Sequence, residues 1–299
     1  MPDTSPVAAL VNRYGPRLLA IATRMCGNRA DAEDVVQDTF LQAHRAWNQF
    51  QHRSDPGTWL YTIAARRCRR RYIRPRTRHP MPAFSDLAPF RDRGVANIPL
   101  NSPGAPERAV TAEHIRALHR AIEKLPIDFR LPLVLKDIAE MSLIEVGQAL
   151  GIKPDTAKTR VHRARLLLRA ELMKRTPQRP APEPTYERSL CLDLLAAKLS
   201  ALDAGRAGTL PQRIVCERCR AVFAELDMTR SACARLAEGD LPPRLRRAIQ
   251  THLAAESSRH IPGTPAPRRA SNKRQARAPS PAPKAPGGRH DARTRTKRP

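Results

Sequence analysis

Apolar residues recur along most of the chain at intervals of three or four, the spacing that places side chains on one face of an α-helix. Residues 28–47 give one example, in which Val36, Phe40, Ala43 and Trp47 fall on a common stripe. No segment alternates β-branched apolar residues with polar ones in the manner of a half-exposed strand. The pattern predicts an all-α protein.

Proline-rich stretches divide this helical pattern into blocks. We expect a first small helical domain over residues 5–74 and a second over 108–175, joined by a flexible linker at 75–107 that is rich in Pro and Asn. A second proline-rich stretch leads to a short helical extension at 187–255, in which cysteines cluster. Residues 257–299 hold almost no large apolar side chains and cannot bury enough surface to offset the entropy of ordering. We expect them to form a disordered basic tail.

The second block contains the sequence pattern of a helix-turn-helix, MSLIEVGQALGIKPDTAKTRVHRAR. Ser142 is expected to start a short helix that stops at Gly151, and Asp155 to cap the second helix after a tight connection. The small Gly147 allows the close approach that such a pair of helices needs. Four apolar positions are expected to form the inner stripe of the second helix: Ala157, Val161, Ala164 and Leu168.

The charge of the chain indicates a partner for this second helix. The 299 residues carry a formal net charge of +26, which favours a polyanion, and nucleic acid ahead of a membrane surface. The side opposite the inner stripe is basic, as expected of a helix that enters the major groove of DNA, where Lys and Arg reach guanine edges. A solvated basic face with no special role is the alternative interpretation. The candidate DNA-reading residues are Thr156, Lys158, Thr159, Arg160, His162 and Arg163, with Leu166 also expected on the outer side.

A second basic helix is expected in the first block, in GTWLYTIAARRCRRRYIR. Its second half is basic on all sides, and burial of unpaired guanidinium groups is costly, so we expect it to face solvent or phosphate. Aromatic rings just upstream could stack on unpaired bases, although ordinary core packing is an equal alternative for both. The candidate DNA-binding residues here are Trp59, Tyr61, Arg66, Arg67, Arg70, Arg71 and Arg74.

The helix expected after Asn28 combines an apolar stripe with an acidic opposite face. Asn28 can cap this helix, and acidic residues in its first turns interact favourably with the helix dipole. A leucine exposed inside an acidic patch suggests a docking surface, whereas a merely solvated face is the alternative. The residues of this face are Asp34, Gln37, Asp38 and Leu41.

Taken together, DAEDVVQDTFLQAHRAW, GTWLYTIAARR and the helix-turn-helix block resemble regions two and four of bacterial RNA polymerase sigma factors of the extracytoplasmic-function group. The resemblance covers about residues 7–74 and 108–172, in the right order and separation. It implies a non-enzymatic initiation factor whose acidic helix docks on the β′ clamp helices of core polymerase. The β subunit, promoter DNA and a separate anti-sigma factor are the other partners it implies.

The same resemblance implies that residues 54–74 contact and open the minus-ten promoter element. Lys158, Thr159, His162 and Arg163 would read the minus-thirty-five element. The chain departs from the family at Arg66, where an Asn is usual, and near Arg70, where an Asp is usual. The minus-ten sequence preference therefore cannot be transferred, and a stronger electrostatic attraction to the duplex is expected instead.

The cysteine-containing extension predicts a metal or thiol site. Cys216 and Cys219 have the CxxC spacing that suits tetrahedral zinc when further ligands converge, and buried structural thiols or a redox pair are the alternatives. The stretch resembles the zinc-binding domain of anti-sigma factors, with Cys191 at the first ligand position but Gln212 where a His is usual. Cys233 or His252 could complete the candidate zinc set of Cys191, Cys216 and Cys219. The resemblance implies that the extension packs against the sigma regions and inhibits them, and no other cofactor is expected.

Other classes of protein are less consistent with the chain. A conventional helix-turn-helix regulator is the main alternative, whereas the chain has no Gly-rich phosphate loop, no Ser-centred nucleophile elbow and no His-Glu zinc motif. A thiol oxidoreductase would need a βαβ context that is absent. The first residues do not form a signal peptide, and no apolar run approaches the ~20 residues that span a bilayer. We expect a cytoplasmic protein with no membrane partner, and the six cysteines are too few for a disulfide scaffold.

Overall fold

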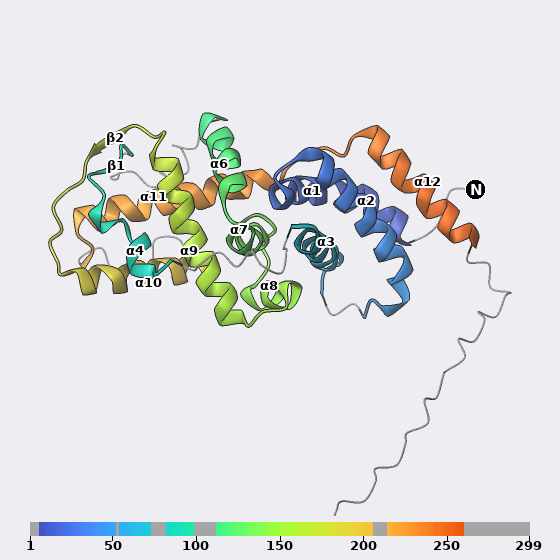
Figure 1. Ribbon diagram of the computed structural model, residues 1–299, viewed down its shortest axis with the longest axis horizontal. Coiled ribbons are helices and arrows are strands. Elements are labelled where there is room, and N and C mark those ends of the chain that lie inside the picture. Colours follow the sequence, from blue (N-terminus) through green and yellow to red (C-terminus); the bar gives the residue numbers. More distant parts are fainter. Residues whose placement is uncertain (1–5, 52–53, 73–81, 99–111, 206–213, 260–299) are drawn as a thin grey trace, which may run out of the picture. The chain divides into compact units, whose positions relative to one another are not determined.

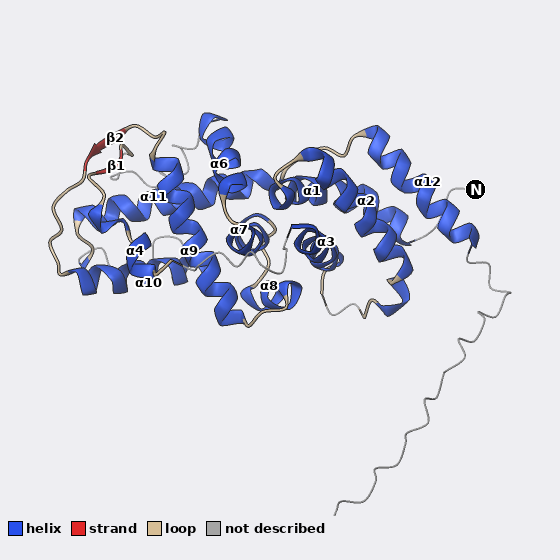
Figure 2. Cartoon of the chain, viewed as in Figure 1, coloured by secondary structure: helices blue, strands red, loops and turns tan. Residues whose placement is uncertain are grey.

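The computed structural model describes residues 6–51, 54–72, 82–98, 112–205 and 214–259, and these are mostly helical (Figure 2). The predicted all-α fold is confirmed. The first block contains α1 (Pro6–Cys26), α2 (Arg29–Arg45), the 3-10 turn η1 (Trp47–Gln49) and α3 (Pro56–Tyr72). The second contains α6 (Ala112–Lys124), α7 (Ile127–Leu133), the π-helical turn η3 (Val134–Ile138), α8 (Leu143–Leu150) and α9 (Pro154–Met173). The extension contains α10 (Arg188–Asp203), α11 (Glu217–Ala234), the 3-10 turn η5 (Arg235–Ala237) and α12 (Pro243–Arg259), as Figure 1 shows.

The helix starts predicted at Asn28 and Ser142 are confirmed by their caps. The Asn28 side chain accepts a hydrogen bond from the backbone N–H of Asp31, and this satisfies a free donor of the first turn. Ser142 and Glu145 form a reciprocal capping box at the start of α8. Local hydrogen bonding thus sets both boundaries.

The turn of the helix-turn-helix depends on two glycines. Gly151 ends α8 with φ of 63°, a left-handed conformation that favours glycine. A Cβ at Gly147 would lie 2.8 Å from the carbonyl oxygen of Ile152, so the close approach is between α8 and the turn itself. The predicted cap at Asp155 is wrong, because α9 already begins at Pro154, a residue favoured at the first helical position since it has no N–H to satisfy. Lys153 precedes it as the N-cap residue.

The described part of the predicted flexible linker, residues 82–98, is folded. It contains α4 (Phe84–Leu87), the 3-10 turn η2 (Pro89–Arg91) and β1 (Gly94–Ala96). β1 pairs antiparallel with β2 (Gln178–Pro180), in a register that places Val95 opposite Arg179. Three-residue strands are too short to carry an alternating pattern, so the sequence did not predict them. Residues 75–81 and 99–107 of the linker, and the predicted tail from 260 onwards, lie outside the described residues.

One hydrophobic cluster joins all the blocks. It includes buried side chains from α1, α2 and α3, from α6 to α9, and from α11 and α12. Direct contacts between α3 and α8 are part of this arrangement, and the described residues belong to one compact unit. The two sigma-like blocks therefore pack on each other here, and the expectation of two separately folded modules on a tether does not hold for this conformation.

A second, smaller cluster lies between α9, α10 and α11. It contains Leu166 of α9 together with apolar residues of the extension, and Phe84 and Phe90 of the folded linker pack against it. Within the described ranges, no helix is both long enough and apolar enough to cross a membrane.

Candidate functional site

The acidic face of α2 is exposed but paired with α3. The side chains of Asp34 and Asp38 are 67% and 52% exposed. Arg67 donates to Asp38 at 2.8 Å, and Arg71 contacts Asp34 at 3.4 Å and also pairs with Asp31. Arginines expected to face solvent or phosphate are thus partly neutralised by carboxylates. The predicted DNA-binding residues of α3 and the predicted docking residues of α2 meet along the α2–α3 boundary. The sequence pattern did not reveal this because the partners lie on different helices.

The same α2–α3 boundary includes the N-terminal end of α2. Hydrogen bonds from Asn28 and Tyr72 lower the pKa of Asp31, and the charge of Arg71 lowers it further. The pKa of Tyr72 is raised, first by burial and then by this hydrogen bond. The end of α3 is therefore attached to the start of α2.

Two further arginines of α3 bind the helix-turn-helix. Arg66 donates to the carbonyl oxygens of Gln148 and Ala149, at 3.1 and 3.3 Å. Arg69 donates to that of Leu150 at 2.7 Å. These are the last carbonyls of α8, which have no partner within their own helix and carry the negative end of its dipole. Arg66 and Arg70 are both exposed, as expected, but Arg66 also binds the end of α8, which the sequence did not predict, and Arg74 lies outside the described residues.

The two aromatic candidates on α3 have different environments. Trp59 is half-buried, with its ring 4.7 Å from that of Phe50 and 6.1 Å from that of Trp47, between centroids. Trp47 is likewise half-buried, so it closes the predicted stripe of α2 only partly. Tyr61 is 5% exposed, and burial raises its pKa to about 12. It is a core residue, so the prediction that its ring is available for base stacking is wrong here.

The inner stripe of α9 is confirmed, since Ala157, Val161, Ala164 and Leu168 are all fully buried. On the outer side Thr159 is exposed, while Arg160 pairs with Asp128 at 3.1 Å. The remaining candidates are half-buried: Thr156, Lys158, His162 and Arg163. The outer side of α9 is therefore exposed near the start of the helix and becomes more buried toward its second half.

The second half of the outer side of α9 is buried by α10 of the extension. His162 meets Asp203 at 2.7 Å, and its side chain is 11% exposed. Leu166 is 1% exposed and belongs to the cluster that contains Leu195 and Leu199 of α10. The prediction that His162 and Leu166 point outward fails here because α10 supplies both a carboxylate and an apolar surface.

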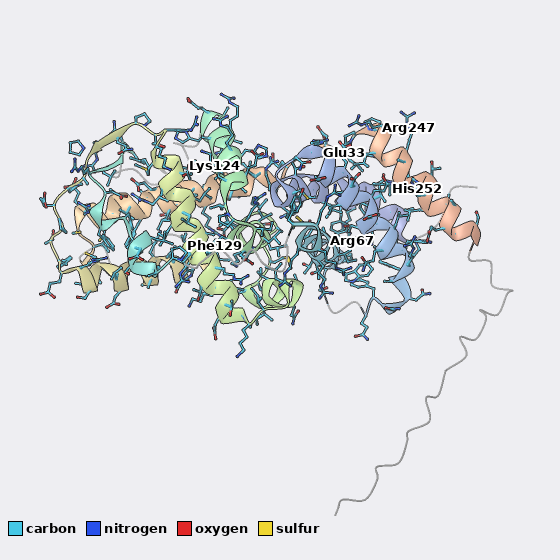
Figure 3. The ribbon with its side chains drawn as sticks, in the orientation of Figure 1. Glu33, Arg67, Lys124, Phe129, Arg247 and His252 are labelled. Carbon is cyan, nitrogen blue, oxygen red and sulfur yellow. The ribbon has the colours of Figure 1, made fainter. Side chains whose placement is uncertain are left out.

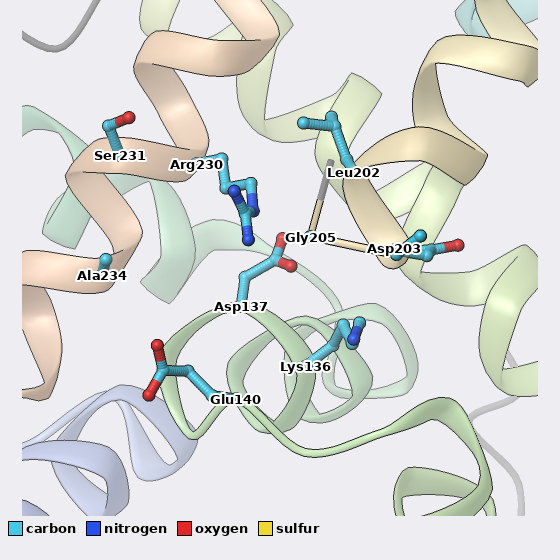
Figure 4. Close-up of a pocket in the computed structure, with 10 residues that line it drawn as sticks. Lys136, Asp137, Glu140, Leu202, Asp203, Gly205, Arg230, Ser231 and Ala234 are labelled. Carbon is cyan, nitrogen blue, oxygen red and sulfur yellow. The ribbon is translucent and has the colours of Figure 1, made fainter. Parts of the chain in front are cut away.

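Arg165, which the sequence reasoning missed, links α9 to both neighbours. It is 2% exposed and donates to both carboxylate oxygens of Asp137 at 2.6 and 2.8 Å, and to Asp203 at 2.7 Å. Burial by itself would raise the pKa of Asp203, but His162 and Arg165 outweigh this and the pKa lies below its ordinary value. A cavity of about 400 Å³ adjoins this network, between η3, the end of α10 and α11 (Figure 4). Arg165 falls four residues after Val161, so helical spacing could have indicated its burial.

A second buried arginine connects α9 to α11 and to the folded linker. Arg169 is 2% exposed and pairs with Glu225, and also with Asp92 at 2.7 Å. Burial raises the pKa of Glu225, and the charge of Arg169 offsets only part of this rise. Arg218 of α11 donates to the carbonyl oxygens of Phe90 and Asp92. The extension is thereby attached to the second sigma-like block and to the folded linker.

The cysteines of the extension gather only in part. The Sγ atoms of Cys191 and Cys219 lie 4.0 Å apart. Burial works to raise the pKa of Cys216, but backbone hydrogen bonds at Cys219 and Thr185 outweigh it and lower that pKa. Cys233 belongs to the other hydrophobic cluster, so it does not complete a set with these three.

The candidate zinc ligands do not form a complete set within the described part of the chain. His252, the other candidate ligand, lies on α12 and contacts Gln37 of α2 at 3.2 Å. Across the described ranges no group of three or more His, Cys, Asp or Glu residues is arranged to hold a metal ion. Gln212 lies outside the described residues. Zinc at this site stays a prediction, which metal analysis of the purified protein can check.

Comparison with known proteins supplies the family. The family model described as Sigma-70 region 2 matches residues 10–79, and that described as Sigma-70, region 4 matches residues 115–168. The ECF RNA polymerase sigma factor SigW of Bacillus subtilis is 33% identical over 171 residues, which are 57% of this chain and 90% of SigW. The ECF sigma factor SigE of Mycolicibacterium smegmatis is 35% identical over 173 residues, 56% of this chain and 62% of that relative.

Two further matches are also sigma factors. The RNA polymerase sigma-H factor of Pseudomonas aeruginosa is 30% identical and covers 52% of this chain and 80% of its own. A solved structure of the sigma factor RpoE in complex with the anti-sigma factor NepR, from Bartonella quintana, is 23% identical and covers 56% of this chain and 96% of that one, with a TM-score of 0.36. Because the chain matches nine-tenths of SigW at 33% identity and carries regions 2 and 4 in order, it belongs to the ECF family of RNA polymerase sigma factors.

Proposed function

We propose that this protein binds core RNA polymerase and directs it to promoter DNA, where transcription starts. Membership of the sigma factor family is the observation that carries the proposal, and the two matched segments contain the helices that would perform it. The catalytic chemistry belongs to the polymerase, so no catalytic residue is needed in this chain. Its place of action is the cytoplasm, with the polymerase.

Each task is assigned to one helix. α2 contacts the β′ clamp helices, α3 contacts and opens the minus-ten element through its basic second half, and α9 reads the minus-thirty-five element. The polymerase β subunit is a second contact. The residues assigned to polymerase binding are Asp34, Gln37, Asp38 and Leu41, and those assigned to reading DNA on α9 are Lys158, Thr159, His162 and Arg163.

We further propose that the extension holds the protein in a closed state. α10 covers the second half of the DNA-reading face of α9, where His162 meets Asp203 and Leu166 is buried. Arg165 adds a buried ion-pair network across the same boundary. The covered second half of α9 cannot enter a major groove while α10 stays in place.

The distance between the two promoter elements supports the same conclusion. Their names place them about 25 base pairs apart, which is roughly 85 Å at about 3.4 Å per base pair. In contrast, Arg66 of α3 lies within 3.1 Å of the end of α8, the first helix of the helix-turn-helix. The two blocks must therefore separate before they contact both elements at once.

Run-off transcription with purified core polymerase tests the proposed function. We expect transcripts from specific start sites when the chain is added, and none from core polymerase alone. A conventional regulator would instead bind an operator without polymerase and would direct no initiation. That outcome would refute the assignment.

Two features outside the sigma regions belong to the proposal. The basic tail adds non-specific, salt-sensitive DNA affinity, because each phosphate contact releases counterions. A separate anti-sigma protein is a candidate partner that would have to displace the extension. Removal of residues 261–299 should reduce the salt dependence of DNA binding and leave start-site choice unchanged.

A further inference from the structure

α12 packs along α2 through a regular apolar face. Leu245, Ile249 and Leu253 recur every four residues and are 5%, 0% and 0% exposed. The helix contacts both α2 and α1, and its remaining positions are mostly basic or small. This is the packing of an amphipathic helix in a groove between two others.

Polar contacts fix the register of α12 on α2. Gln37 meets His252 at 3.2 Å, and Arg45 donates two hydrogen bonds to Glu256 at 2.7 and 2.8 Å. Arg244 pairs with Glu33 at 3.1 Å. Figure 3 shows Glu33 on α2 and His252 on α12 along this boundary.

The α2 residues that meet α12 follow one row of the helix surface. Glu33, Gln37 and Arg45 make these contacts and fall on a single i, i+4 ridge of the kind that helices use to pack, and Leu41 occupies the position between Gln37 and Arg45 on that ridge. Leu41 is partly buried against the hydrophobic cluster that includes Ile249 and Leu253. Two of the four proposed polymerase contacts, Gln37 and Leu41, therefore lie on the row that α12 occupies.

We infer that α12 competes with core polymerase for α2. This inference rests on the proposed function, because it takes α2 as the polymerase-docking helix. A helix with its side chains is about 10–12 Å across, so α12 and the clamp helices cannot occupy the same flank together. Core polymerase captures only the fraction of molecules in which α12 has left α2, and its apparent affinity falls by that fraction.

α12 is also connected through the chain to the helices that pack on α9. It follows α11 through η5 and the segment that contains Leu241, which packs against Gly15 of α1. α11 in turn pairs with Arg169 of α9 through Glu225. The extension thus contacts the polymerase side and the DNA side of the molecule at the same time.

The opening arm of the test uses full-length chains that differ at adjacent positions of α12. Ile249→Asp places a charge in the buried face, whereas Gln250→Asp places the same charge on the exposed face. We expect Ile249→Asp to bind core polymerase at least tenfold more tightly than the wild-type chain, and Gln250→Asp to bind within twofold of it. Binding is measured by titration of labelled chain with purified core enzyme, after a thermal melt of each variant.

The locking arm changes no residue of the buried apolar face. Arg45→Cys and Glu256→Cys, cross-linked by a short bismaleimide, tie α12 to α2 in the full chain. The six native cysteines are buried, so the reagent is directed to the introduced thiols. We expect the cross-linked protein to lose at least tenfold in polymerase affinity, and each single-cysteine variant treated with the same reagent to keep it.

The outcomes separate the inference from the proposed function. If the locked protein, the singly modified controls and Ile249→Asp all bind core polymerase equally well, α12 is not a competitor and the inference is overturned. If no form binds core polymerase, the proposed function itself fails. If Ile249→Asp does not fold, the locking arm decides the question alone.

Discussion

Arg165 and Arg67 both pair with carboxylates, but only Arg165 does so away from water. Its side chain is 3% exposed, as is that of Asp137, and Asp203 is 8% exposed. The Arg67 and Asp38 side chains are 32% and 52% exposed. Solvent screens the exposed pair, whereas loss of the buried guanidinium leaves Asp137 without its ion-pair partner and Asp203 with His162 alone. Residues of the same type thus differ in their contribution to stability.

We predict that Arg165→Met destabilises the folded protein by about 3–5 kcal/mol, because it leaves the buried Asp137 carboxylate unpaired. Lys124→Met is the matched control, since it breaks an ion pair to Glu171 in which the Lys side chain is 60% exposed. Such surface pairs contribute about 0–1 kcal/mol. Urea unfolding of both variants measures the difference, and an equal loss would contradict the assigned role of Arg165.

The lowered pKa of Asp203 predicts a pH dependence of stability. Its pKa in the folded state lies below the ordinary value of 3.8. A carboxyl group of this kind stabilises the fold above its unfolded pKa, and the contribution is lost as pH falls through the folded pKa. We predict that Asp203→Asn lowers stability at pH 6 and that the gap to wild type narrows below about pH 4. Thermal melts between pH 3 and pH 6 test this, and a gap that does not change with pH would exclude the ionised Asp203 as its source.

At the scale of elements, the extension uses one helix for each functional surface. α10 covers α9 through His162, Arg165 and Leu166, and α12 covers α2 through its apolar face. The linker residues Phe84 and Phe90 pack against α10 and α11, and Arg218 of α11 donates to the carbonyl oxygen of Phe90. Separate helices can therefore be released by separate substitutions.

We predict that Leu195→Asp in the full chain increases affinity for promoter duplex by about tenfold, because the fraction of molecules with an uncovered α9 rises. Leu195 is fully buried between α10 and its neighbours, whereas the adjacent Ala196 is exposed. Ala196→Asp adds the same charge and should leave affinity unchanged. Fluorescence anisotropy at one fixed salt concentration compares the two variants, and equal affinities would show that α10 does not limit access to α9.

At the scale of the whole molecule, the described residues adopt one closed arrangement of two regions that the proposed function requires to separate. Arg66 and Arg69 attach α3 to the last carbonyls of α8, and a shared hydrophobic cluster continues across the same boundary. Under the proposed function, promoter binding requires these contacts to break, and the free energy of opening would then set the fraction of active protein.

We predict that binding to core polymerase and promoter DNA separates the two blocks. Donor and acceptor dyes at Asn48→Cys and Ala170→Cys, two exposed positions in the first and second blocks, report this by energy transfer. We expect the efficiency of energy transfer to fall when core polymerase and promoter are added. Without them, the efficiency should be lower in the Arg66→Ala/Arg69→Ala protein than in the wild type. Unchanged transfer in the transcribing complex would contradict a closed starting state.

The sequence determined the parts of this protein that depend on near neighbours. The helices, the caps at Asn28 and Ser142, the glycine turn at Gly151 and the inner stripe of α9 all follow from interactions within a few residues. The family resemblance rests on the same local segments, and the matches to regions 2 and 4 confirm it. The N-cap of α9 was predicted at Asp155 and lies at Lys153, a small error because Pro154 and Asp155 both favour a helix start.

Only the tertiary structure decided which polar side chains meet. Gln37 meets His252 across 215 positions, Arg66 meets the end of α8 across more than 80, and His162 meets Asp203 across 41. A basic helix face has the same sequence pattern whether its partner is phosphate, a carboxylate or the end of another helix, because a guanidinium group binds all three. Periodicity predicted the candidate surfaces of this sigma factor, and long-range packing decided that the extension covers parts of two of them.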